Sequence, residues 1–248
     1  MKPAFRYILP VLALLAATPV RAEDETKLAR EILRTAEDLR FITKSQADVD
    51  LKTVTPDSNI LYDLKVLSST DQRAYLEFLA PKEERGRKML AITKQFWSTF
   101  PDSKRVVAIS KKEMIGNSAF AMADIFQIDQ EKDYEPSIAA REKLDGKDVI
   151  KLDLKSKHQE TPYHRLEYWV EAKGYFPVLC KMYAKSGKHL KSMYVESRKK
   201  FGDKERPETT RMEDEVQKGH TSWWPNKKLF EVNVPDNVFT KDYLLRRL

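Results

Sequence analysis

The chain of 248 residues carries a net charge of +7 and contains a single cysteine. One cysteine excludes an intrachain disulfide, so the fold must be stabilised by packing. The positive charges are interleaved with Asp and Glu and form no basic stripe with stacking aromatic residues, which argues against nucleic acid as a partner.

Residues 1–22 are expected to form a cleavable signal peptide. A positively charged start precedes an apolar run from Tyr7 to Ala17, and Val20-Arg21-Ala22 places small residues at the two positions that a signal peptidase recognises. The apolar run is too short to span a bilayer, which needs about 20 residues. We therefore expect cleavage after Ala22, a periplasmic location and a mature domain over residues 23–248. The alternative is an uncleaved anchor.

The mature chain is expected to open with an amphipathic helix over residues 27–41. Asp24 and Thr26 are both suitable N-caps for it. Apolar residues recur at helical spacing, with charged residues on the opposite face; they are Ala29, Ile32, Leu33, Ala36 and Leu39. A helix of this kind needs an apolar surface to lie on.

Alternation of apolar and polar residues predicts strands through most of the remaining chain. The expected strands cover residues 59–67, 71–81, 87–94, 95–101, 104–110, 147–157, 164–172, 176–185, 188–201, 206–217 and 220–234. Asp145-Gly146, Lys173-Gly174 and Ser186-Gly187-Lys188 are typical of hairpin turns. The interpretation is a mainly β fold of one long, curved antiparallel sheet, which tends to curl into an unclosed barrel. A terminal helical turn is expected over residues 239–248.

Residues 111–142 interrupt the strand pattern. This stretch is markedly apolar, and Gly116 and Asn117 indicate a bend within it. We predict an irregular segment with short helices. Because an apolar loop of this length must be buried, it is expected to form an apolar plug against the curved sheet.

No residue pattern indicates an enzyme, a cofactor or a metal site. The four histidines, at positions 158, 164, 189 and 220, do not stand at ligand spacing from one another or from the cysteine. Gly116 to Phe120 resembles the start of a nucleophile elbow, but Phe120 stands where the second glycine is required. Cys180 lies in an apolar strand pattern and is expected to be a small buried hydrophobe.

A series of motifs runs in order through nearly all of the mature chain. AREILRTAEDLRF at residues 29–41 forms the opening helix, residues 73–110 a strand core, and NSAFAMADIF at residues 117–126 a run of small and aromatic residues that ends near an Asp. GHTSWW at residues 219–224 and VPDNVFT at residues 234–240 complete the series. In this order and spacing the motifs resemble those of the outer-membrane lipoprotein-sorting protein family, the LolA-like periplasmic carriers.

Two positions depart from the commoner pattern of that family. Asn117 and Ala121 stand where a Gly and an Asp or other polar residue are expected. The resemblance is therefore nearer to a divergent branch than to the dedicated lipoprotein chaperone.

The resemblance implies an unclosed β-barrel with helices acting as a lid over an apolar cavity. It also implies a monomeric carrier of lipids or lipoprotein acyl chains, which works beside an inner-membrane transporter of the RND type and needs no cofactor. The physical reason for such a cavity is general, because exposing an acyl chain to water costs about 0.8 kcal/mol per CH2 group.

The residues expected to bind the acyl chain come from strands and from the interrupting segment. Leu76, Phe78, Trp97, Trp169, Met182 and Met193 are predicted to line the concave side of the sheet. Phe120, Met122, Ile125 and Phe126 are predicted to line the lid. An error of one residue in strand phase would move a side chain to the opposite face.

Two other functions remain open from the sequence. The first is a periplasmic sensor or regulatory module that binds a membrane-protein partner. The second is an enzyme on a lipid-binding scaffold, for which no nucleophile–base pair is evident in the sequence.

Overall fold

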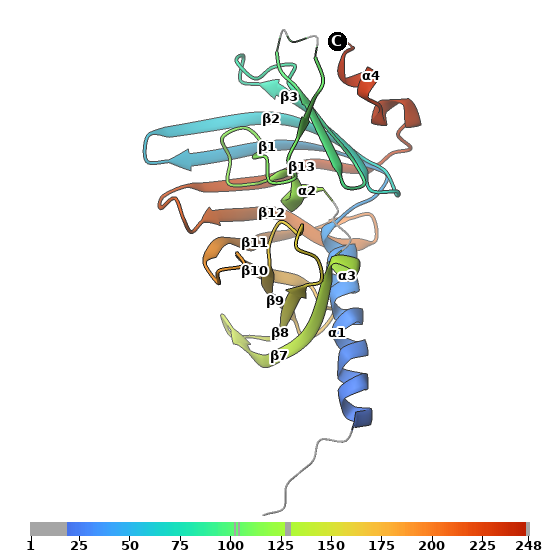
Figure 1. The fold of residues 1–248 in the computed structure, drawn as a ribbon, viewed down its shortest axis with the longest axis vertical. Coiled ribbons are helices and arrows are strands. Elements are labelled where there is room, and N and C mark those ends of the chain that lie inside the picture. The colour runs from blue at the N-terminus through green and yellow to red at the C-terminus, as the bar shows by residue number, and fades with distance from the viewer. Residues whose placement is uncertain (1–18, 102, 104, 127–129, 247–248) are drawn as a thin grey trace, which may run out of the picture.

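The structure is a computed structural model that describes residues 19–101, 103, 105–126 and 130–246. It is dominated by one antiparallel sheet of 13 strands in the order β6-β5-β4-β3-β2-β1-β13-β12-β11-β10-β9-β8-β7 (Figure 1). Residues 1–18 of the expected signal peptide lie outside the described residues. None of the described helices combines the length and the hydropathy needed to cross a membrane.

The strands are bounded as follows: β1 (Ser45–Thr55), β2 (Ser58–Ser68), β3 (Arg73–Ala80), β4 (Lys88–Ile92), β5 (Gln95–Thr99), β6 (Val107–Ile109), β7 (Tyr134–Leu144), β8 (Lys147–Ser156), β9 (Arg165–Glu171), β10 (Pro177–Tyr183), β11 (His189–Phe201), β12 (Lys204–Asp214) and β13 (Thr221–Glu231). The helices are α1 (Pro19–Arg40), α2 (Met122–Ile125), α3 (Gln130–Asp133), the 3-10 helix η1 (Asp236–Phe239) and α4 (Lys241–Leu244).

The sheet consists of two meanders joined side by side. Strands β1–β6 form one meander and β7–β13 the other, and each connection within them is a hairpin between neighbouring strands. The first strand then pairs with the last, with Ser45 opposite Glu231. Because β6 and β7 stand at the two edges, the curved sheet is an open barrel, as the sequence pattern predicted.

Three elements differ from the sequence-based expectation. Strand β1 was missed, although its inward residues are buried in strict alternation. Strand β7 occupies the second part of the region predicted to be irregular, so only residues up to 133 hold the short helices α2 and α3. Helix α1 begins at Pro19, upstream of both predicted N-caps.

Each face of the sheet carries its own core. The inner face packs against α1 and the segment around α2 in one large cluster that includes Ile32, Leu51, Leu76 and Phe120. Part of the outer face is covered by η1 and α4, which pack over β3, β4 and β5 in a second cluster. Burial of apolar surface on both faces stabilises this half of the sheet.

Candidate functional site

A cavity of about 140 Å³ lies between the inner face of the sheet and the segment that contains α2. Its apolar lining includes Val66, Phe120, Ile125, Phe126, Met193 and Trp224. Its charged lining consists of Arg40, Arg73, Asp124 and Arg206. The cavity is therefore apolar over much of its wall but is also faced by ionised groups.

The segment of residues 113–126, hereafter the covering segment, folds back on itself above the sheet. Met114 pairs with Ala121, and Ile115 N donates to Phe120 O at 2.9 Å. The bend at Gly116 has a φ of +61°, and a Cβ atom there would lie 2.7 Å from Cζ of Tyr62. Glycine is needed at this bend because both the backbone conformation and the close approach disfavour a side chain.

Side chains from the strands bind the backbone of the covering segment. Asn117 N donates to the Tyr62 hydroxyl and Ala119 N donates to Ser222 Oγ, both at 2.9 Å. The Ser222 hydroxyl also lies 2.9 Å from Thr53 Oγ1. These contacts orient the bend above β1, β2 and β13.

Asp124 holds the other end of the covering segment through a buried ion pair. Its carboxylate, 1% exposed, lies 3.0 Å from Lys191 Nζ. It also accepts hydrogen bonds from the Tyr163 hydroxyl at 2.6 Å and from Ala121 N at 2.8 Å. Arg40 Nη2 donates to the backbone oxygen of Asp124, which ties the end of α1 to α2.

A second buried polar group adjoins this ion pair at the end of α1. Arg40 lies 3.6 Å from Glu37, and Tyr168 donates to Glu37 Oε1 at 3.1 Å. Burial raises the pKa of Glu37, against the opposing effects of Arg40 and Tyr168. Burial also raises the pKa of the nearby Cys180 thiol to about 12, so this cysteine is a neutral thiol at physiological pH.

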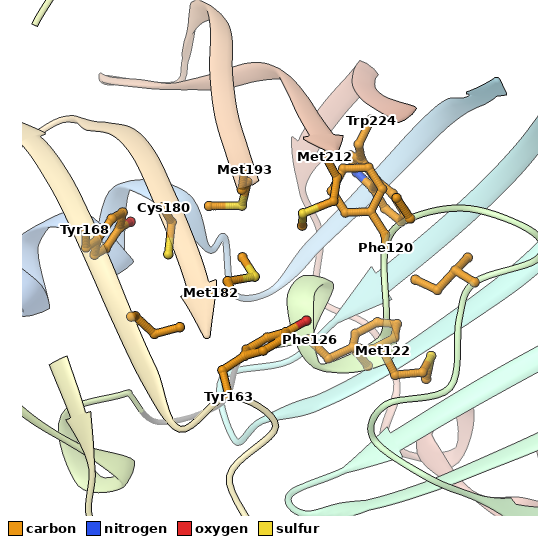
Figure 2. Packing of buried hydrophobic residues seen from close by; sticks show 14 of the residues in the cluster. Phe120, Met122, Phe126, Tyr163, Tyr168, Cys180, Met182, Met193, Met212 and Trp224 are labelled. Atoms are coloured by element: carbon orange, nitrogen blue, oxygen red, sulfur yellow. The ribbon is translucent and has the colours of Figure 1, made fainter. Parts of the chain in front are cut away.

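Sulfur and aromatic side chains form the wall beneath the covering segment. Cys180, Met193 and Met212 lie opposite one another on three neighbouring strands, and Figure 2 shows them together with Met182 in the same region of the core. The ring of Phe120 packs edge-on against Trp224 with centroids 5.6 Å apart. Methionine side chains adapt readily to changes in the shape of their neighbours.

Known proteins with the same fold identify the family. A protein-family model described only as that of an uncharacterized protein matches residues 70–246. A solved LolA superfamily protein from Nitrosomonas europaea is 28% identical, with a TM-score of 0.79 over 87% of this chain and 98% of that chain. The chain belongs to a divergent LolA-like family. This agrees with the family resemblance found in the sequence.

Two other solved structures share the fold of this LolA-like protein. A protein from Vibrio parahaemolyticus described as a putative outer membrane lipoprotein-sorting protein domain is 24% identical, with a TM-score of 0.77 over 91% of this chain and 100% of that chain. A DUF1329 family protein from Desulfovibrio piger is 19% identical, with a TM-score of 0.81 over 89% of this chain and 99% of that chain. No curated protein matches the chain.

The structure brings most of the predicted binding residues of this LolA-like protein to the inner face. Leu76, Phe78, Phe120, Met122, Phe126, Met182 and Met193 belong to one core cluster, and Ile125 packs against it. Only Phe120, Ile125, Phe126 and Met193 line the cavity itself. Their contact with a ligand stays a prediction.

The placement of two tryptophans on the concave side was wrong. Trp97 lies opposite Leu90 and packs in the outer cluster, with Lys241 Nζ 4.4 Å from the centre of its ring. Trp169 packs with Leu179 on the outer face near β8. Residues on both faces of β5 are buried. A large apolar side chain in this strand therefore does not indicate which face is the inner one.

Several cavity residues were not found from the sequence. Trp224 was noted only as the last residue of the GHTSWW motif, although its position in the alternation of β13 could have identified its face. Asp124 was recognised only as the Asp of the NSAFAMADIF motif. The contacts of Arg40 with the backbone of Asp124 and of Arg206 with the end of α1 gave no local signal, because these partners lie far away in the chain.

Proposed function

We propose that this protein is a periplasmic carrier that shelters the acyl chain of a lipid or lipoprotein between the sheet and the covering segment. It receives or delivers this cargo beside an inner-membrane transporter of the RND type, acts as a monomer and uses no cofactor. The observation that carries the proposal is the apolar cavity closed by a segment with its own apolar side chains, in a LolA-like fold.

The size of the cavity favours a mobile covering segment. A cavity of about 150 Å³ holds a molecule of the size of benzene, and the cavity in this structure is about 140 Å³. A long acyl chain is larger, so the covering segment must move away from the sheet to admit it. In the loaded state the chain lies between Phe126 on the segment and Trp224 on the sheet, both of which line the cavity.

The free energy that opening the covering segment costs can be compared with the free energy gained when an acyl chain leaves water. Moving the segment disrupts the buried contacts of Asp124, and breaking a buried ion pair costs about 3–5 kcal/mol. An acyl chain of twelve carbons gains roughly 9 kcal/mol when it is removed from water, at about 0.8 kcal/mol per CH2 group. The gain exceeds the cost by a margin that still permits release, which a carrier requires.

The proposed location rests on the first part of the chain. A signal peptide over residues 1–22, cleaved after Ala22, would deliver the mature chain to the periplasm. Sequencing the amino terminus of the protein recovered from a periplasmic fraction tests this. An intact Met1 on a membrane-bound protein would contradict it.

Native mass spectrometry of the mature protein from its own periplasm, with lipid extraction alongside, tests the proposal. A retained acylated species in a one-to-one ratio supports a carrier and identifies the class of cargo. An apo mass that stays unchanged after mixing with envelope lipids refutes it and favours a module that binds a membrane-protein partner.

A further inference from the structure

The charged residues that line the cavity differ in whether they have a partner. Arg40 pairs with Glu37, and Asp124 pairs with Lys191. Arg73 pairs with Asp71 and with Asp236, each at 2.7 Å.

Arg206 is the exception among these four residues. Within the described part of the chain, no carboxylate lies within ion-pair distance of its guanidinium. The cavity therefore contains one positive charge without an ion-pair partner among the described residues, and Asp38 attracts it only from beyond ion-pair distance.

The hydrogen bonds of Arg206 use only one of its three nitrogen atoms. Its Nη1 donates to the backbone oxygens of Asp38 at 2.7 Å and of Leu39 and Phe41 at 3.3 Å. This contact caps the carboxyl end of α1, where unpaired carbonyl groups carry partial negative charge. Neither Nε nor Nη2 contacts an acceptor among the described residues.

The free edge of this guanidinium suits an oxyanion. Nε and Nη2 point their N–H groups in parallel, which is the geometry that binds a carboxylate or phosphate through two hydrogen bonds. Arg206 is also partly buried, and burial lowers its pKa, because its positive charge lies partly out of water. An anion would be attracted more strongly here than at an exposed arginine.

The rest of the cavity suits a hydrocarbon chain. Phe126, Met193 and Trp224 line it together with Arg206. Apolar walls with one unpaired cation are complementary to a molecule that has one alkyl chain and one negative head. A lipoprotein's acylated amino terminus is a neutral amide and would leave the cation unpaired.

We propose that the cargo is an amphiphile whose anionic head, a carboxylate or a phosphate, binds Nε and Nη2 of Arg206 while its alkyl chain enters the cavity. This inference rests on the proposed carrier function and names the chemical class of its ligand. It also gives Arg206 a role in selecting the cargo.

Calorimetric titration of the mature protein with three twelve-carbon ligands below their micelle concentrations tests this inference. Dodecanoate and dodecyl phosphate carry an anionic head, and dodecanol is the neutral control. We expect at least one anion to bind about ten- to a hundred-fold more tightly than dodecanol, because a bidentate charged contact has that effect. Which anion binds more tightly separates a fatty acid from a phospholipid-type head as the source.

Substitutions in β12 test whether Arg206 causes the preference for an anionic ligand. Arg206→Gln is expected to remove the preference for the anion, and Arg206→Lys to keep part of it. Lys204→Gln, an exposed cation on the same strand that does not line the cavity, is the matched control and should keep the full preference. If Arg206→Gln does not fold, the preference of the wild type for an anion over dodecanol and the affinities of Arg206→Lys still test the inference.

The outcomes separate the two proposals. Equal affinity of the wild type for dodecanol and for both anions overturns the anionic-head inference and leaves the carrier proposal standing. A preference that survives in Arg206→Gln overturns the role of Arg206. Failure of all three ligands to bind contradicts the carrier function itself and therefore also the inference that an anionic head binds Arg206.

Discussion

Replacing Asp124 by Asn is expected to release the covering segment from the sheet. The substitution keeps the shape of the side chain but leaves Lys191, whose side chain is 10% exposed, without its negative partner. Removing one member of a buried pair costs about 3–5 kcal/mol. In the wild type Tyr163 and Ala121 donate to different carboxylate oxygens. The asparagine oxygen can still accept from Ala121 N, and its amide group can donate to the Tyr163 hydroxyl oxygen, so the lower end, about 3 kcal/mol, is expected.

This free energy should appear mainly in the local opening of the covering segment. A change of about 3 kcal/mol multiplies the open population roughly a hundred-fold. Hydrogen exchange of amides in residues 113–126 should accelerate by that factor, while amides in central strands such as β1 and β13 change less. If acyl ligands bind only the open form, their apparent affinity should rise as the open form becomes more populated.

The double variant Asp124→Asn with Lys191→Met is the matched control. It removes the unpaired charge, so its segment should exchange more slowly than in the single variant. Equal acceleration of segment and strand amides in Asp124→Asn would show that the ion pair stabilises the fold as a whole and not the closed segment. Faster exchange without any change in affinity would show that opening does not limit binding.

Three further outcomes are expected. Ile125→Ser combined with Phe126→Ser should weaken binding of a twelve-carbon acyl ligand about ten-fold or more in a calorimetric titration, because apolar lining is lost; unchanged affinity in a folded variant would contradict the site. Gly116→Ala should lower the urea midpoint more than Gly86→Ala, since both have positive φ but only a Cβ at Gly116 meets a tyrosine ring, at 2.7 Å; equal effects would exclude the clash. Burial raises the pKa of Glu37, whereas in the unfolded chain this carboxyl group loses its proton at about the ordinary value, pH 4.3. The native state therefore keeps the proton to a higher pH than the unfolded chain. The contribution of Glu37 to the free energy of unfolding consequently falls as the pH rises from the unfolded value through the native pKa. Glu37→Gln should flatten that slope in urea midpoints measured across this range; an unaltered slope would assign it to another group.

The repeated strands were predictable from the sequence because their alternation has a simple physical cause. Strand β8 alternates Ile150, Leu152 and Leu154 against polar partners, and these three residues pack in the inner core. Strand β7 gave a weaker signal, since it lies at an edge of the sheet and most of its residues are exposed or half-exposed. Only its first residues alternate between buried and exposed, with Tyr134 and Pro136 buried. So short an alternation does not distinguish the strand from the irregular segment before it.

The site was less predictable because it depends on which face a side chain occupies and on distant partners. Leu76 and Phe78 were placed on the correct face, whereas the nearby Trp97 was not, since β5 is buried on both faces. The contact of Arg206 with the end of α1 joins residues more than 160 positions apart. No local pattern encodes such a contact, and it becomes visible only when β12 has been placed beside the helix.

The pairing of β1 with β13 affects how the chain can fold. The strands are 165 residues apart from the end of one to the start of the other, by the bounds Thr55 and Thr221, and contacts between such distant segments slow folding because a long loop must close first. Either meander can form its hairpins early, but each then exposes an unpaired strand, β1 or β13. Such edges are sites of aggregation. A chain that emerges amino terminus first therefore cannot complete its sheet until the last strand has appeared, and it depends on protection of the β1 edge until then.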